Sequence, residues 1–186
     1  MSNHVRNRVE FVGDDARIDE LLAFVSSVED EPEGGSEFDF NKIIPQPSNV
    51  YKGSFGFGEH EDEIRKKGMV TWYDFNLRNW GTKWNSYNVI VYDKTVEFDT
   101  AWSMPHPVFL SLSEQFPDVT IAASYADEDI GSNCGRTLYK DGQAIEDVVF
   151  DSYSDDSCDF ATRLRYNQSY EEFKAEYEAD YGVEDA

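Results

Sequence analysis

The sequence is poor in cysteine and in basic residues, and it contains no long hydrophobic run. Cys134 and Cys158 are the only cysteines in the 186 residues. Two thiols cannot supply the four ligands of a typical iron–sulfur cluster, and they do not give the disulfide density of a small secreted domain. No apolar run is long enough to span a bilayer, and the first residues lack the apolar segment of a signal peptide. These deficits predict reduced thiols and a cytoplasmic protein that does not bind membranes.

Signatures of catalysis and of metal binding are also missing. Neither a G-x-S-x-G motif nor a glycine-rich phosphate loop followed by lysine is present. His4, His60 and His106 are scattered without metal-ligand spacing. Oxygen ligands crowd residues 127–133, but their spacing does not fit a calcium-binding loop. We therefore predict no catalytic residue, no metal and no cofactor, and hence no enzyme. A small-ligand or metal-dependent enzyme of unknown reaction remains an alternative.

Acidic residues far outnumber basic residues in the chain, and they are clustered. The chain has 38 Asp and Glu against 16 Lys and Arg, a formal net charge of −22. Residues 141–186 hold 14 acids and 3 bases, a net of −11, whereas residues 64–94 hold 6 bases and 2 acids, a net of +4. Aromatic residues make up 15% of the chain, more than in a disordered acidic segment. The pattern predicts a folded domain with a polarised surface charge.

The hydrophobic pattern predicts an α+β fold. Alternation of apolar and polar residues predicts strands at 3–12, 37–44, 87–92, 95–102 and 119–125. Helical spacing of apolar residues follows the first strand and the fourth. This order matches a ferredoxin-like split βαβ antiparallel sheet with helices on one face. An added hairpin surrounds Asp141-Gly142, and a C-terminal helix begins near Ser169. We predict one domain over 1–186, with an insertion at about 46–85 and an acidic extension at about 151–186.

Six stretches of the chain carry a family resemblance. They are residues 3–9 (NHVRNRV), 38–47 (FDFNKIIPQP), 79–85 (NWGTKWN), 98–107 (FDTAWSMPHP), the helix end at 112–117 (LSEQFP) and 125–135 (YADEDIGSNCG). Together they resemble the YubB ferredoxin-like family, which is found on plasmids and in phages and prophages. The resemblance extends to about residue 142. It implies a ferredoxin-like fold and a mobile-element origin, but no known reaction and no established site residues.

A tryptophan-rich run is the first candidate binding surface. Trp80 and Trp84 are four residues apart, and the predicted fold brings Trp72 and Trp102 near them. The polar side chains of this candidate surface are Arg78, Asn79, Lys83 and Asn85. Exposed together, these side chains would stack on nucleic-acid bases and hold phosphates. Segment 64–94 is thus a candidate nucleic-acid-binding module, although the net charge opposes that use. The commoner role of tryptophan is packing of the core, and we favour that role here.

The acidic C-terminal region is the second candidate surface. Asp151, Asp155 and Asp156 precede the last predicted helix, which contains Glu172 and Glu176. Such a run is most often a solubilising face. It could also be a carboxylate array that occupies the nucleic-acid-binding groove of another protein. Our leading hypothesis is therefore a mobile-element accessory protein that docks on a basic host or defence protein, with nucleic-acid mimicry as its possible mode.

Overall fold

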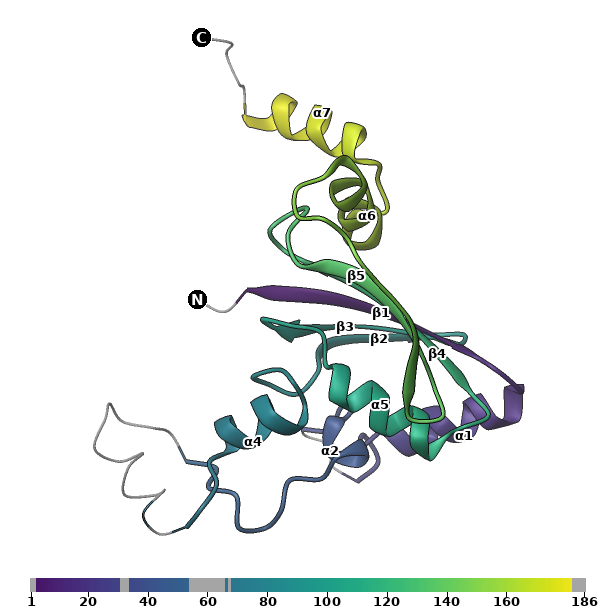
Figure 1. Ribbon diagram of the computed structural model, residues 1–186, viewed down its shortest axis with the longest axis vertical. Coiled ribbons are helices and arrows are strands. Elements are labelled where there is room, and N and C mark those ends of the chain that lie inside the picture. The colour runs from purple at the N-terminus through teal and green to yellow at the C-terminus, as the bar shows by residue number, and fades with distance from the viewer. Residues whose placement is uncertain (1–2, 31–33, 54–65, 67, 182–186) are drawn as a thin grey trace.

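A six-stranded antiparallel sheet forms the centre of the computed structural model, which describes residues 3–30, 34–53, 66 and 68–181 (Figure 1). The strands are β1 (His4–Val12), β2 (Tyr87–Tyr92), β3 (Thr95–Ala101), β4 (Thr120–Asp127), β5 (Cys134–Lys140) and β6 (Gln143–Val149). Their order is β2-β3-β1-β4-β5-β6. The first four strands have the ferredoxin-like arrangement, and β5 and β6 extend the sheet beyond β4 as a hairpin. The predicted fold class is confirmed.

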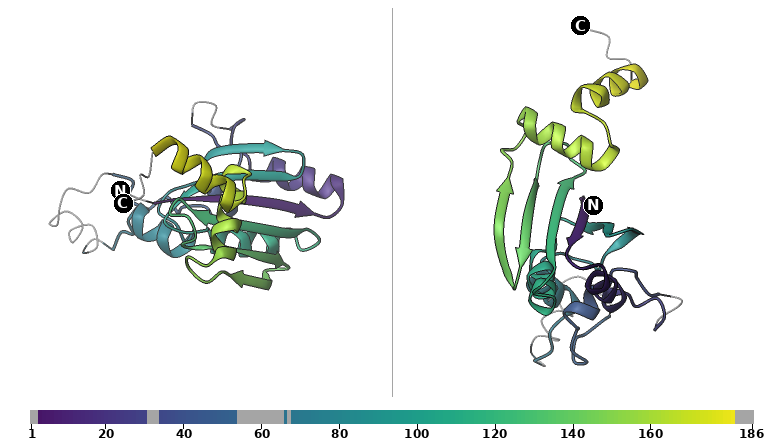
Figure 2. Two further views of the ribbon diagram at one scale, coloured as in Figure 1. Left: turned by 90° about the horizontal axis from the view of Figure 1, so that it is seen from above. Right: turned by 90° about the vertical axis from the view of Figure 1, so that its right-hand side faces the viewer.

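Helices lie on both sides of this sheet. Those below it in Figure 1 are α1 (Asp15–Val25), α2 (Phe40–Ile43), α4 (Trp72–Asn79) and α5 (His106–Gln115). The two helices of the ferredoxin-like plan, α1 and α5, thus share one face as expected. The C-terminal helices α6 (Asp155–Tyr166) and α7 (Tyr170–Tyr181) lie above the sheet in the same view. Figure 2 shows α6 crossing one end of the strands and α7 projecting beyond it.

Alternation along the strands directs the apolar side chains to the α1 and α5 face. In β1, Val5, Asn7, Val9 and Phe11 are buried, while the residues that alternate with them are more exposed. Phe98 of β3 lies at the centre of this core, where its ring stacks on Phe38 with centroids 4.9 Å apart. Each fully buried side chain of this kind contributes about 1.5–3 kcal/mol by leaving water. This face therefore supplies most of the stability of the fold.

The predicted strand at 37–44 is wrong. Phe38 and Phe40 are both buried, but residues 40–43 form the short helix α2, whose N-cap Asp39 accepts from the Asn41 amide at 2.8 Å. Side chains just before β2 satisfy this irregular backbone, since Asn85 Oδ1 accepts from the Phe40 amide at 2.9 Å. The backbone of this segment therefore needs no hydrogen bonds from a neighbouring strand. The second strand of the plan is β2, and segment 46–85 lies between α1 and β2.

Two helices follow the hairpin, whereas the sequence predicted one. The additional helix is α6, which begins at the N-cap Ser154 and ends at Asn167, a residue in the left-handed conformation with φ of 56°. Asp155 and Asp156 lie in its first turn and its two arginines in the last turn, which suits the helix dipole. Cys158, Ala161 and Leu164 follow helical spacing, so the sequence contained a signal for this helix, although the segment was interpreted only as part of the acidic extension.

Candidate functional site

Trp80 does not belong to an exposed binding surface. Its side chain is 2% exposed, and its ring packs edge-on against Phe40 with centroids 5.7 Å apart. The indole N–H donates to the Ile44 carbonyl at 3.0 Å. Trp80 therefore fastens the end of α4 to the core, and its inclusion in the predicted binding surface is wrong. The packing role favoured from the sequence is the one observed.

Trp84 has the opposite environment, although it is only four residues further on. Its side chain is 38% exposed. The backbone before it is fixed, because Thr82 Oγ1 donates to the Ala101 carbonyl at 2.6 Å and Asn76 Nδ2 donates to the Lys83 carbonyl at 2.8 Å. Trp84 is thus displayed at the surface by a segment that is tied to β3 and α4.

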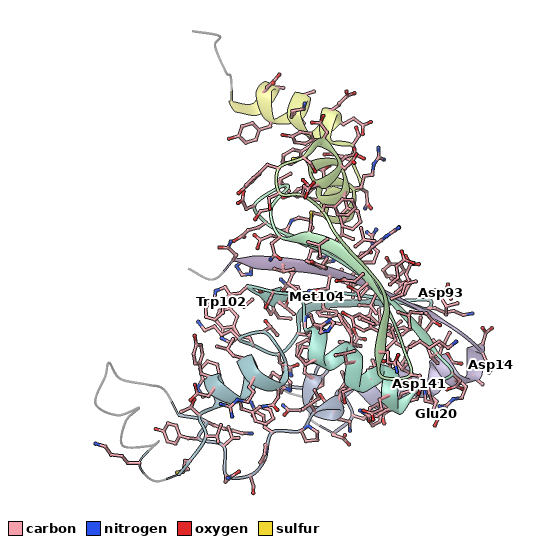
Figure 3. All side chains as sticks on the ribbon, viewed as in Figure 1. Asp14, Glu20, Asp93, Trp102, Met104 and Asp141 are labelled. Atoms are coloured by element: carbon pink, nitrogen blue, oxygen red, sulfur yellow. The ribbon has the colours of Figure 1, made fainter. Side chains whose placement is uncertain are left out.

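Trp102 joins Trp84 from the end of β3. It is also 38% exposed, and its backbone is in the left-handed region with φ of 77°. Such a conformation costs a bulky residue roughly 1–2 kcal/mol. Two hydrogen bonds hold it there: the Trp102 amide donates to the Asn3 carbonyl at 3.0 Å, and Asn133 Nδ2 donates to the Trp102 carbonyl at 3.1 Å. Figure 3 shows Trp102 at the end of the sheet that lies away from the Asp93 and Asp141 turns.

Lys83 connects the two exposed tryptophans. Its Nζ lies 4.6 Å from the centroid of the Trp84 ring and 5.0 Å from that of Trp102. Both distances are within the range of cation–π attraction. We call Lys83, Trp84, Tyr87 and Trp102 the aromatic patch. The sequence pointed to Lys83 and Trp84 and placed Trp102 nearby, but the contact of Trp102 with Lys83 and its unusual backbone angle are visible only in the structure.

Tyr87 extends the aromatic patch towards the N-terminus of β1. Its ring lies edge-on to Trp84 with centroids 6.2 Å apart, and its hydroxyl shares a hydrogen bond of 2.6 Å with His4 Nδ1. Burial raises the pKa of Tyr87 to about 12, and the negative charges of Asp99 and Glu128 act in the same direction. Tyr87 therefore stays protonated at neutral pH. A shallow hollow of about 380 Å³ lies beside it, lined by Trp84, Asn85, Ser86 and Tyr87.

The basic residues of segment 64–94 do not gather around these aromatic side chains. Arg78 lies on α4 and lines a separate hollow with Gly68, Met69, Val70 and Asp74. Lys94 lies in the turn between β2 and β3 and forms an ion pair with Asp15. Arg65 and Lys67 are outside the described residues. Lys66 is described and exposed, but among the described bases of this segment it is Lys83 whose contact with the tryptophan rings is observed.

The acidic C-terminal residues are exposed, as expected from their charge. Asp151 precedes α6, Asp155 and Asp156 form its first turn, and Glu172 and Glu176 lie on α7; all five side chains are exposed. Glu172 also caps α7, because its Oε2 accepts from the Ser169 amide and hydroxyl, each at 2.8 Å. These hydrogen bonds lower the pKa of Glu172. We call these five exposed acids the acidic arm.

The two arginines of α6 have different partners, one within the helix and one in the sheet. Arg163 pairs with Asp159 at 2.6 Å. Arg165 Nη1 reaches back to the sheet and donates to the carbonyls of His4 at 3.2 Å and Ala126 at 3.1 Å. These contacts anchor α6 against β1 and β4. Arg165 thus directs its charge inwards, whereas Arg163 stays exposed on the outer surface beside Asp159.

The connection between β4 and β5 joins the aromatic patch to the acidic arm. Asn133 contacts Trp102, while Asp129 Oδ2 accepts from the Tyr153 hydroxyl at 2.7 Å just before α6. Glu128 and Asp129 are exposed on this connection. Asp127 is buried and accepts from Asn3, Asn133 and the Asp129 amide, so it has a structural role. No cluster of three or more metal-ligating side chains is present in the described part of the chain.

The architecture defines a ferredoxin-like α+β domain with a hairpin and two helices added at its C-terminal end. Residues 79–178 match the family described as the ferredoxin-like domain in Api92-like protein. The match covers more than half of the chain, so the chain belongs to this family. It includes Lys83, Trp84, Trp102 and the whole of α6.

A solved structure supports the fold. The crystal structure of protein api92 from Yersinia pseudotuberculosis aligns with a TM-score of 0.52 and 11% identity, covering 83% of this chain and 100% of that one. At this identity the likeness concerns the fold alone. No curated protein matched the sequence. None of the helices in the described ranges has the length and apolar character needed to cross a membrane.

Proposed function

We propose that this protein is a non-catalytic binding protein whose acidic arm docks on a basic partner protein. The observation that carries the proposal is the placement of α7, which packs against α6 and projects away from the sheet (Figures 1 and 2). All residues from Lys174 to Ala179 are exposed. A helix that buries so little adds little to the stability of the domain, so its surface is available for a partner.

The distribution of side chains on α7 fits this role. Phe173 stacks on Tyr166 of α6 with ring centroids 5.1 Å apart, which orients the helix. Glu172 and Glu176 are four residues apart and therefore share another face. Like charges at this spacing repel by about 0.2–0.5 kcal/mol, and a cationic surface would turn that repulsion into attraction. The negative electrostatic field of these carboxylates speeds the encounter with a basic protein and disfavours binding to acidic proteins.

We further propose that the partner is a host or defence protein whose groove otherwise holds nucleic-acid phosphates, with the carboxylates of the arm as phosphate mimics. The resemblance to the YubB family supports a mobile-element setting. The free state of Cys134 and Cys158 is consistent with a reducing cytoplasm. Direct nucleic-acid binding through segment 64–94 is the weaker proposal, because Arg78 and Lys94 do not join Lys83 on the aromatic patch.

Affinity for a cationic probe tests the acidic arm. The test variant combines Asp155→Asn, Asp156→Asn, Glu172→Gln and Glu176→Gln, and short poly-L-lysine is titrated by isothermal calorimetry over a series of rising salt concentrations. Gln at position 172 retains a carbonyl acceptor for the cap. We expect about tenfold weaker binding, because exposed charge pairs contribute about 0.3–0.5 kcal/mol each and 1.4 kcal/mol is a factor of ten.

A second variant with the same change in net charge is the control. It combines Asp19→Asn, Glu29→Gln, Glu37→Gln and Glu114→Gln, four exposed acids that lie outside the acidic arm. If the arm is the docking surface, this control keeps nearly the full affinity of the unmodified protein. Equal losses in the two variants would show that net charge alone attracts the probe, and the proposal would be rejected.

A further inference from the structure

We propose that Trp84 and Trp102 form a receptor for a single cationic side chain, arginine or lysine, of a basic partner, and that Lys83 occupies this receptor in the free protein. The inference deepens the proposed function, since it requires a cationic partner. It assigns a specific anchor point to an interface that would otherwise depend on diffuse charge.

The position of the Lys83 ammonium shows which chemistry the two rings accept. Nζ lies 4.6 Å from one centroid and 5.0 Å from the other, so a single cation contacts both indoles. Indole is the aromatic side chain with the strongest attraction for cations, and grouped aromatic rings are known receptors for quaternary ammonium ligands. The chain's own lysine therefore acts as a stand-in for a partner's cation.

The frame around the pair is built before any partner arrives. Thr82 and Asn76 hold the segment that carries Trp84. Asn3 and Asn133 hold the backbone of Trp102 in a strained conformation although its side chain is 38% exposed. A bulky residue in the left-handed region is unfavourable for folding, and strain of this kind concentrates at functional sites. Because the rings are already oriented, binding sacrifices little conformational freedom.

The surrounding charge favours a cation over an anion. The chain carries a net charge of −22, and Glu128 and Asp129 are exposed on the connection that contacts Trp102 through Asn133. A phosphate approaching Lys83 would meet this negative field, whereas a guanidinium or ammonium would be attracted by it. An arginine of the partner can also stack flat on an indole and is more weakly hydrated than lysine. It can therefore displace Lys83 into water.

Lys83 and a cation of the partner compete for the same two rings. Removal of the Lys83 charge should therefore strengthen the binding of an added cation. Lys83→Met keeps an unbranched side chain but removes the ammonium, which leaves the two rings open to an added cation. The probe is N-acetyl-arginine amide, and the readout is the chemical shift of the tryptophan indole N–H groups in the NMR spectrum. We expect the Trp84 and Trp102 signals to titrate with about threefold to tenfold higher affinity in Lys83→Met than in the unmodified protein. The signals of Trp72 and Trp80 should not move.

Two variants control for charge and for folding. Lys94→Met makes the same change in net charge at the turn between β2 and β3, and it should leave the affinity for the probe unchanged. Trp102→Asn removes one ring while keeping a residue that tolerates a positive φ, and it should abolish the response. An unchanged or weaker response in Lys83→Met would overturn the proposal. So would a stronger response of Lys94→Met than of Lys83→Met.

Two further measurements separate this inference from its rivals. The variant that neutralises the acidic arm should still bind N-acetyl-arginine amide at the tryptophans, so loss of poly-L-lysine binding and loss of the receptor are distinguishable. Single-stranded oligothymidylate is the anionic probe. If it shifts the Trp84 and Trp102 signals, and Lys83→Met abolishes that shift, the surface is a nucleic-acid site and the cation receptor is rejected.

Discussion

The two faces of the sheet are stabilised to very different extents. Below it, α1 and α5 enclose a large core that includes Phe98, Phe109 and Leu112. Above it, α6 covers a small cluster of buried residues: Ala126, Cys134, Ala161 and Leu164. Buried apolar area is the main source of folding free energy, so the first face maintains the fold. The second face contributes less, and it carries the helices of the acidic arm to which we assign docking (Figure 1).

The largest predicted effect is in the lower core. Phe98→Ala removes a fully buried ring that stacks on Phe38, and we expect it to lower the free energy of unfolding by about 3–5 kcal/mol. Denaturation in urea, followed by far-UV circular dichroism, measures this loss. A cost below that of a truncation in the upper cluster would contradict the proposed division between the two faces.

An intermediate effect is expected in the upper cluster. Leu164 is 6% exposed and belongs to the small group around Cys134, so Leu164→Ala should cost about 2 kcal/mol, the low end for such truncations. Burial raises the pKa of Cys134 to about 11. Loosening of α6 should lower that pKa towards its ordinary value and increase the thiolate fraction at pH 8.

The reactivity of the thiols measures this loosening separately from global stability. We expect a disulfide reagent to modify Leu164→Ala faster than the unmodified protein, while Phe98→Ala serves as a core variant that leaves the contacts of α6 intact. The comparison is made under conditions in which both variants are folded. If Cys134 reacts at the same rate in Leu164→Ala and in the unmodified protein, α6 does not depend on the upper cluster for its position.

The sequence predicted the elements in which local pattern and tertiary role agree. Alternation located β1 and β3, and Asp141-Gly142 located the β5–β6 turn, where both residues have positive φ values. The prediction was wrong at Phe38 and Phe40, because both rings enter the core from backbone that Asn85 and Ser86 satisfy from a distant segment. Alternation alone cannot distinguish such a segment from a strand.

The candidate site was predicted only in part for a similar reason. Residue type located Lys83 and Trp84, but it gave no means to separate the exposed Trp84 from the buried Trp80. That difference depends on which indole finds a carbonyl within the core, as Trp80 does at Ile44. Trp102 joins the patch through an unusual φ angle and through contacts with Asn3 and Asn133, none of which is visible in local sequence.

Truncation of Phe173 of α7 should have the smallest effect on the free energy of unfolding. Comparison with Leu164→Ala then tests whether α7 is less important than α6 for the stability of the fold. The Phe173 ring is half-buried and packs on Tyr166, whose side chain is itself 45% exposed. We expect Phe173→Ala to change the free energy of global unfolding by no more than about 0.5 kcal/mol, as for most surface positions. Amide hydrogen exchange in α7 should nevertheless rise, because this helix can open without the sheet. A global loss equal to that of Leu164→Ala would mean that α7 belongs to the cooperative core. It would then be a structural element, and its exposed acids would require another explanation than a docking arm.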